Sequence, residues 1–247
     1  MSGLDWLIAR PVAHRGLQDA AKGVIENTPS AFAAAVAGDY AIECDLQITA
    51  DGEAMVYHDD ALGRLTEGSG RLDAMTAATL KSVPFRATAD RMIAVGELCD
   101  LVAGRVPLVI ELKSHGDCDQ RVVARAADVL SHYAGPAALM SFDPAQIATL
   151  REIAPALPRG LVAERHRRVA SDSLIVGMRR AMAYAPEALR TRPQFLAYGV
   201  TDLPGAVPWM ARNLLGLPLL TWTVRSDDDR KRAARWADQI IFEGFRP

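Results

Sequence analysis

Short apolar segments alternate with longer segments of helical periodicity along this chain, and this alternation restricts its fold more than any other feature. The apolar segments predict strands over residues 11–14, 41–48, 54–57, 107–113, 137–142, 159–163, 195–200, 217–224 and 239–242. Helices are predicted near residues 28–37, 76–82, 95–103, 118–133, 144–152, 172–184, 205–214 and 227–236. Apolar strands separated by helices are typical of parallel sheets that are buried on both faces.

The number of strands favours a closed barrel. If 54–57 is a small extra strand, the remaining strand–helix units fit one (β/α)8 TIM barrel, a single α/β domain spanning residues 1–247. A doubly wound open sheet is the alternative, because the pattern of elements barely separates the two. Residues 59–95 are long and polar for a connecting loop, so we interpret them as an insertion after the second strand that carries a short helix. The few residues after 239–242 predict a truncated last βα unit.

Charge and cysteine content exclude several classes of protein. The chain has 28 basic and 30 acidic residues, a net charge of −2, which gives no general attraction to nucleic acid or to an anionic membrane. The sequence has no apolar run of membrane-spanning length and no recognisable signal peptide. Its three cysteines follow no zinc-binding or redox spacing, so a reducing, cytoplasmic setting is expected. A homo-oligomer is left open.

Four of the predicted strands carry charged or histidine side chains, either within the strand or directly at its end. In chain order these are His14-Arg15-Gly16, Glu43-x-Asp45, His58-Asp59 and Glu111-x-Lys113. Each motif alone more often marks a polar turn or a surface ion pair. Active sites of (β/α)8 barrels lie at the C-terminal ends of the strands, and the joint occurrence of these motifs there favours a functional site.

Strand geometry predicts where these charges point. Side chains two residues apart share a face, so Glu43 and Asp45 point the same way, as do Glu111 and Lys113. Packing the apolar residues between them against the helices turns all four charged groups into the barrel. Carboxylates buried there are costly without a partner. Oxygen ligands from Glu43, Asp45 and Glu111 would suit Mg²⁺ or Ca²⁺ rather than zinc.

Taken in order, the motifs resemble those of the glycerophosphodiester phosphodiesterases, in the phosphatidylinositol-phospholipase-C-like TIM-barrel superfamily. The similarity also includes Glu26-Asn27-Thr28 and Asp51-Gly52, and more loosely Ser141-Phe142-Asp143 and Thr221-Trp222-Thr223-Val224. It runs from about residue 11 to residue 247, and its first half is the more specific part.

The resemblance implies a TIM barrel that hydrolyses glycerophosphodiesters to an alcohol and sn-glycerol 3-phosphate, a reaction of lipid and glycerol metabolism. It implies one divalent cation, Mg²⁺ or Ca²⁺, held by Glu43, Asp45 and Glu111. It assigns acid/base catalysis to His14 and His58 and phosphate binding to Arg15 and Lys113. Trp222 either packs in the core or forms an apolar wall that binds the substrate. Glu26 and Asn27 either cap a helix or support the site by orienting His14 or the ligand. Asp59 either orients His58 or caps a turn.

Elementary chemistry agrees with these roles. Attack on an anionic phosphodiester adds charge to its oxygens, which a cation and fixed basic side chains stabilise. Histidine accepts and donates protons near neutral pH. Lys113 is one of only four lysines in the chain, which mildly supports a specific role.

Two other functions remain as alternatives. They are phospholipase D-like hydrolysis of lysophospholipids or related lipid diesters, and a non-catalytic barrel that only binds phosphate.

The sequence departs from the family pattern near its last predicted strand. After Ile240-Ile241 the family usually has a threonine–aspartate pair, whereas this chain has Phe242-Glu243. The resemblance therefore assigns no site residue to this end.

Overall fold

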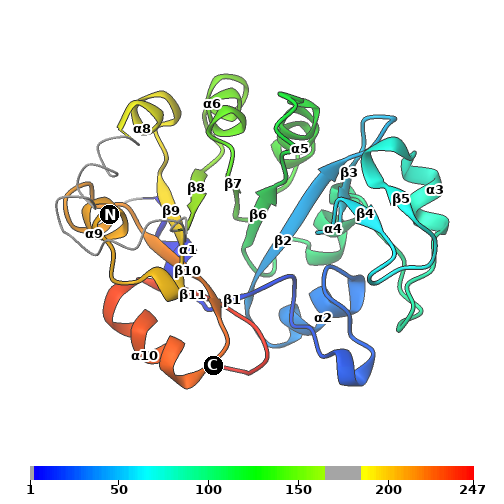
Figure 1. Cartoon of the computed structure of the whole chain (residues 1–247), viewed down its shortest axis with the longest axis horizontal. Coiled ribbons are helices and arrows are strands. Elements are labelled where there is room, and N and C mark those ends of the chain that lie inside the picture. Colours follow the sequence, from blue (N-terminus) through cyan, green and yellow to red (C-terminus); the bar gives the residue numbers. More distant parts are fainter. Residues whose placement is uncertain (1–2, 165–184) are drawn as a thin grey trace.

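The computed structural model describes residues 3–164 and 185–247. Eight parallel strands of the described residues form its centre: β1 (Val12–Ala13), β2 (Ala41–Ile48), β6 (Leu108–Leu112), β7 (Ala137–Ser141), β8 (Arg159–Ala163), β9 (Phe195–Gly199), β10 (Leu219–Val224) and β11 (Gln239–Phe242). They pair in this order, and β1 pairs with both β2 and β11, so the sheet closes on itself (Figure 1). The predicted (β/α)8 TIM barrel is confirmed, and the open-sheet alternative is wrong.

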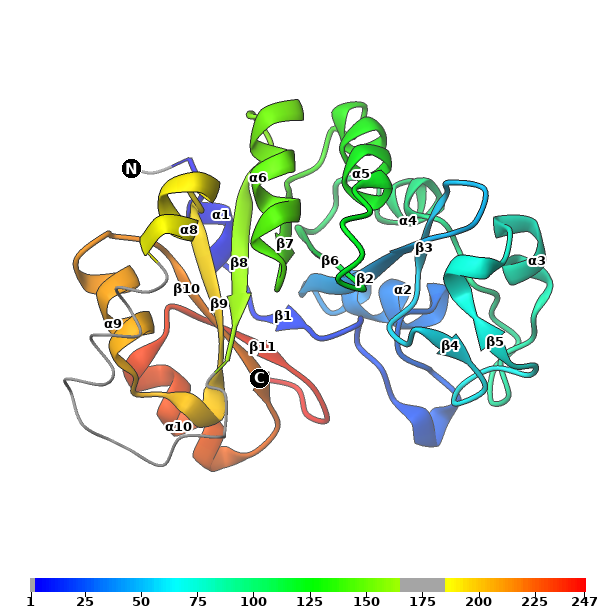
Figure 2. The same ribbon diagram turned by 45° about the horizontal axis from the view of Figure 1, so that its top comes forward.

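Helices lie outside the strands and follow them in sequence (Figures 1 and 2). They are α2 (Pro29–Ala37), α4 (Val95–Val102), α5 (Arg121–Ser131), α6 (Pro144–Ile153), α8 (Ala185–Thr191), α9 (Ala206–Asn213) and α10 (Asp227–Trp236), with short 3-10 turns at Ala20–Lys22 and Val200–Asp202. The sequence missed α8 and the N-terminal helix α1 (Asp5–Ile8). The helix predicted at 172–184 lies outside the described residues.

Side-chain caps account for two of the predicted helix starts. Asp143 accepts a hydrogen bond from the backbone N–H of Ala145 at the start of α6 (2.8 Å). At the start of α10, Ser226 and Asp229 each accept from the other's backbone N–H, a reciprocal capping box (both 3.2 Å). These bonds satisfy amide groups that the first helical turn leaves without intrahelical partners.

The predicted insertion follows the second barrel strand. The extra strand β3 (Ala54–Val56) pairs antiparallel with β2, and the chain then forms a two-stranded hairpin of β4 (Ala61–Leu62) and β5 (Gly70–Arg71). A 3-10 turn (Leu72–Ala74) and helix α3 (Ala77–Ser82), the short helix that the sequence predicted, complete it. Figures 1 and 2 show this segment in cyan at one side of the barrel.

The barrel interior is filled at its N-terminal end by apolar side chains. Val12, Val109 and Phe195 form one buried cluster with Leu7 of α1. Phe195 needs a neighbour without a side chain, because a Cβ at Gly160 would lie 2.4 Å from its ring. Close packing of this layer leaves the C-terminal ends of the strands to the polar residues.

Alternation along β2 and β6 separates the charged side chains from the apolar ones. Cys44 and Leu112 pack in the cluster between the strands and the helices, as predicted. Asp45 on β2 is in register with Glu111 on β6, which brings their carboxylates together inside the barrel. No helix within residues 3–164 or 185–247 has the length and hydropathy needed to cross a membrane.

Candidate active site

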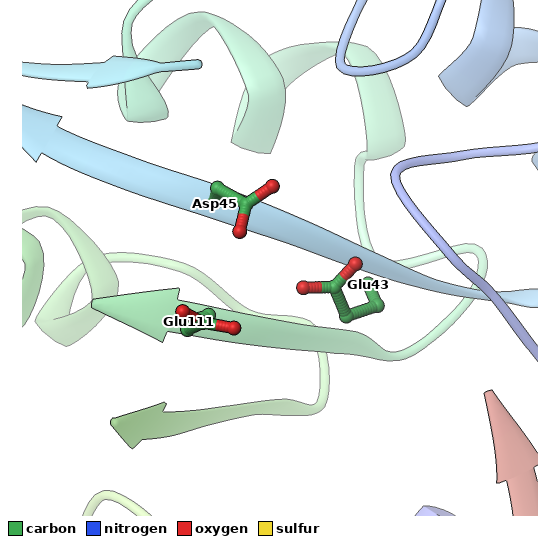
Figure 3. Close-up of side chains that lie close together, drawn as sticks. All are labelled: Glu43, Asp45 and Glu111. Atoms are coloured by element: carbon green, nitrogen blue, oxygen red, sulfur yellow. The ribbon is translucent and has the colours of Figure 1, made fainter. Parts of the chain in front are cut away.

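Three buried carboxylates form the centre of the candidate site. Glu43 and Asp45 come from β2 and Glu111 from the neighbouring β6, and their exposed fractions are 2%, 1% and 8%. One oxygen atom of each lies within 4.8 Å of the others. Figure 3 shows the three side chains gathered on these two strands. The structure therefore brings together the three acids that the sequence nominated as cation ligands.

Two cations contact this acidic group. Lys113 Nζ lies 2.8 Å from Asp45 Oδ1 and 2.6 Å from Glu111 Oε1. Arg15 Nε lies 3.2 Å from Asp45 Oδ2 but is buried without a hydrogen-bond acceptor among the described residues. A buried donor of this kind is available to an anionic ligand.

The carboxyl groups differ in how well the protein neutralises them. Burial alone would raise the pKa of Asp45, but Lys113 and Arg15 outweigh it and hold that pKa at about 2. Burial raises the pKa of Glu111 to about 7, helped by the charge of Asp45. Burial and the two neighbouring acids also raise the pKa of Glu43 well above its usual range. The protein's own cations thus serve Asp45 best and leave the two glutamates poorly neutralised.

This donor set fits a hard divalent cation. Glu43 Oε2 accepts a hydrogen bond from the backbone N–H of Arg15 (3.0 Å), and His14 Nε2 lies 3.9 Å from it. Oxygen atoms from three carboxylates match the preference of Mg²⁺ or Ca²⁺. Positive charge bound among them would also offset the burial of Glu43 and Glu111.

His14 lies beside the acids, directly after β1. Its Nε2 is 3.9 Å from Glu43 Oε2, and its Nδ1 is 2.6 Å from Glu243 Oε2. The other oxygen of Glu243 accepts a hydrogen bond from Arg225 Nε (2.8 Å). The bond to His14, supported by Arg225, holds the pKa of Glu243 at about 2. Burial nevertheless lowers the pKa of His14.

His58 has a similar partner. Its Nδ1 is 2.8 Å from Asp59 Oδ1, so Asp59 lies where a residue that orients His58 should lie. Asp59 is in turn bound by Arg64, whose Nε lies 2.6 Å from Oδ2. Each histidine therefore presents Nδ1 to a carboxylate that is itself paired with an arginine, which leaves Nε2 for proton exchange.

Glu26 and Asn27 support groups other than His14. Glu26 Oε1 accepts a hydrogen bond from Arg15 Nη1 (2.7 Å). Asn27 Nδ2 donates to Asp45 Oδ2 (2.8 Å), and the backbone N–H of Asn27 donates to the carbonyl of Arg15 (2.9 Å). Their contacts thus fix Arg15 and Asp45, whereas the sequence suggested His14 or the ligand.

The backbone at these residues is in an unusual conformation. Arg15 and Asn27 have φ of 58° and 57°, in the left-handed region that non-glycine residues seldom adopt. Gly16 follows with φ of 81°, and a Cβ there would lie 2.8 Å from the backbone of Ala31. Such strain is characteristic of residues whose position is fixed by function. The positive φ and the lack of space for a Cβ explain why the third residue of the His14-Arg15-Gly16 motif is glycine.

Trp222 lies on β10 beside an exposed aromatic ring. It packs edge to face against Phe142, which follows β7, with 5.5 Å between ring centroids. Phe142 is 45% exposed, and the indole Nε1 of Trp222 is buried without a hydrogen-bond partner among the described residues. Trp222 is partly buried against the apolar cluster inside the barrel, so its position fits core packing as well as an apolar wall beside the substrate.

Glu243 is the residue that sequence reasoning missed. It occupies the end of the chain where the family pattern breaks, and no role was assigned to it. Its place in the chain could have indicated its proximity to His14. Glu243 directly follows β11, and in a closed barrel that strand lies beside β1, which ends just before His14. The backbone N–H of His14 donates to the carbonyl of Phe242 (2.9 Å), which fixes this proximity.

Buried acids, fixed cations and two histidines at the C-terminal ends of (β/α)8-barrel strands suit an enzyme that hydrolyses an anionic phosphate ester. A family model described as the glycerophosphoryl diester phosphodiesterase family matches residues 14–243. The chain belongs to this family, and it is therefore a phosphoric diester hydrolase of the glycerophosphodiester phosphodiesterase type.

Individual relatives agree with this assignment. The chain is 26% identical over 233 residues to a glycerophosphodiester phosphodiesterase of Caldanaerobacter subterraneus, covering 90% of this chain and 88% of that protein. The structure of a putative glycerophosphoryl diester phosphodiesterase from Silicibacter pomeroyi has a TM-score of 0.75 and 26% identity, with 94% and 89% coverage. An Oleispira antarctica phosphodiesterase, solved with the product sn-glycerol-3-phosphate, shares the fold, with a TM-score of 0.79, 17% identity, and 96% and 93% coverage.

Proposed function

We propose that this chain hydrolyses glycerophosphodiesters to an alcohol and sn-glycerol 3-phosphate, with one divalent cation and two-histidine acid/base catalysis. The observation that carries the proposal is the acidic group of Glu43, Asp45 and Glu111, whose oxygens lie within 4.8 Å of one another. These three residues would hold the cation. The chemistry that it supplies when bound is polarisation of a phosphoryl oxygen and neutralisation of developing charge.

Arg15 and Lys113 would bind the phosphate. Both are mostly buried beside the acids, and a buried cation stabilises added charge on phosphoryl oxygens more strongly than an exposed one. Arg15 offers a planar fork for two oxygens, and Lys113 offers a point charge. Glu26 and Asn27 would keep Arg15 and Asp45 in place through the hydrogen bonds described above.

His14 and His58 would move the protons. A carboxylate at Nδ1 favours the imidazole tautomer with its proton on that nitrogen, so Nε2 exchanges a proton with the nucleophile or the leaving alkoxide. One histidine accepts the proton of the attacking hydroxyl, and the other protonates the departing oxygen. Water or the substrate's own glycerol hydroxyl can attack first, and a phosphorus-31 time course distinguishes them by a transient cyclic phosphate.

Phe142 and Trp222 favour a second candidate substrate class. Exposed Phe142, which packs on the partly buried Trp222 and follows the C-terminal end of β7, could contact an acyl chain, so lysophospholipid diesters stand as the alternative substrate. Parallel assays with glycerophosphocholine and lysophosphatidylcholine separate the two. Faster release of phosphorylated product from the lipid would favour the phospholipase D-like reaction.

The direct test is release of glycerol 3-phosphate from glycerophosphocholine with Mg²⁺, with Ca²⁺ and with chelator. We expect release with at least one metal and none with chelator, and His14→Ala and His58→Ala should abolish it while leaving the fold intact. Full activity in both variants would overturn the acid/base assignment.

We also propose a cytoplasmic location. The free thiols Cys44, Cys99 and Cys118 support a reducing compartment.

A further inference from the structure

Arg64, in the hairpin of the insertion, joins two carboxylates that come from different segments. Its Nε and Nη2 lie 2.6 Å and 2.9 Å from the two oxygens of Asp59. The same Nη2 lies 2.7 Å from Glu26 Oε1, and Nη1 lies 3.4 Å from Glu26 Oε2. One guanidinium thus engages all four carboxylate oxygens of the two residues.

Each of these carboxylates also holds a residue of the proposed catalytic site. Asp59 Oδ1 faces both Arg64 and Nδ1 of His58, which is 2.8 Å away. Glu26 Oε1 accepts from both Arg64 and Nη1 of Arg15, at 2.7 Å each. The continuous path runs from His58 through Asp59, Arg64 and Glu26 to Arg15.

We infer that Arg64 is a positioning residue that fixes the proton-transferring His58 and the phosphate-binding Arg15 relative to each other. The inference rests on the proposed function for the roles of His58 and Arg15, but the contacts that define Arg64 do not depend on those roles. Arg64 belongs to the insertion, so a segment outside the barrel strands takes part in ordering the site.

The geometry distinguishes Arg64 from an ordinary surface ion pair. A single exposed pair is weak and tolerant of change, whereas planar guanidinium contacts to two carboxylates restrict both partners in orientation. Burial alone would raise the pKa of Glu26 and Asp59, but the bonds to Arg64, with Arg15 beside Glu26 and His58 beside Asp59, outweigh it and lower both pKa values. Both partners therefore stay ionised at neutral pH. Lysine has a single nitrogen on a flexible stem, so it could not hold both oxygens of each carboxylate in a fixed orientation.

Arg86 provides a matched control. It lies in the same insertion, its side chain is 48% exposed as that of Arg64 is, and it also forms an ion pair, with Glu67 (3.2 Å). Its Nε donates to the carbonyl of Gly63, next to Arg64 in the chain (3.2 Å). Removing Arg86 therefore disturbs the same loop without touching Glu26 or Asp59.

The kinetic test is a set of double-mutant cycles in the full chain with glycerophosphocholine. Arg64→Gln should lower kcat by roughly 10- to 100-fold, since small misplacements of reacting groups cost that much, and should also raise KM. In an Asp59→Asn background Arg64→Gln should lose the part of its kinetic effect that acts through His58, and in a Glu26→Gln background the part that acts through Arg15. Arg64→Lys should recover the two constants only in part, and Arg86→Gln should leave both constants unchanged.

A second readout does not depend on turnover. In proton NMR spectra, the Nδ1–H of His58 should be protected from exchange in the wild type and in Arg86→Gln, and lost in Arg64→Gln. An unchanged His58 signal in Arg64→Gln, or kinetic effects that multiply in full in both backgrounds, would overturn the inference. A wild type that releases no glycerol 3-phosphate would instead refute the proposed function, and the NMR comparison would still decide the role of Arg64.

Discussion

Cation binding at the acidic group should depend on pH in a way that Glu111 controls. Below neutral pH Glu111 is protonated in the metal-free protein, because burial raises its pKa to about 7. A carboxyl must lose its proton before it can bind a cation, so binding should strengthen as pH rises toward 7. Asp45, with a pKa of about 2, stays ionised throughout and adds nothing to this dependence.

The magnitude follows from the pKa difference. A carboxyl that ionises near pH 7 instead of its usual 4.5 carries about 3 kcal/mol against ionisation. Between pH 5 and pH 7 the loss of this one proton should strengthen cation affinity by roughly 50-fold. Glu43 should add to the slope, because its pKa is also raised.

The assay is calorimetric titration of metal-free protein with Mg²⁺ or Ca²⁺ in buffers of different ionisation enthalpy, which also counts released protons. Glu111→Gln should weaken binding and reduce the slope of log affinity against pH by about one. Glu67→Gln removes a carboxylate paired with Arg86 at the surface and serves as control. Equal slopes in wild type and Glu111→Gln would refute the reasoning.

Three further predictions concern single side chains. Glu243→Gln should lower kcat at least about tenfold, because the carboxylate at Nδ1 of His14 is lost. It should also remove a contribution to the free energy of unfolding that is present above pH 4.5 and lost as pH falls toward 2. An unchanged kcat or an unchanged acid unfolding curve would contradict this prediction. Gly160→Ala should lower the free energy of unfolding by about 1–3 kcal/mol in urea titrations, because its Cβ would meet the Phe195 ring at 2.4 Å, and Phe195→Leu should restore part of it. Phe142→Ala should raise the KM for glycerophosphocholine by roughly 3- to 10-fold with no change in unfolding, and an unchanged KM would exclude the aromatic pair from the substrate site.

The barrel could be predicted from sequence because its signals are local. Runs such as 107–113 and 41–48 are apolar apart from polar or charged residues spaced two apart, and this spacing assigns a face to each side chain without knowledge of the neighbouring strands. The sequence did not predict helix α8, because its seven residues are too few to show a helical hydrophobic period.

Some residues of the site could likewise be predicted from local sequence, and others could not. Glu43, Asp45 and Glu111 follow from strand alternation and the family motif, whereas their pairing depends on the register of β2 with β6. Glu243 contacts a residue 229 positions earlier in the chain, and only closure of the barrel brings the two together. Arg64 acts through contacts across the insertion, and nothing in the spacing from Glu26 to Arg64 indicates that one guanidinium spans two carboxylates.

The most direct test of the account is a crystal structure of the protein with Mg²⁺ or Ca²⁺ and sn-glycerol 3-phosphate. We expect the cation bound by oxygens of Glu43, Asp45 and Glu111, and the phosphate within hydrogen-bond distance of Arg15 and of Nε2 of a histidine. A cation bound elsewhere, or a phosphate beyond hydrogen-bond distance of both His14 and His58, would contradict the proposed active site.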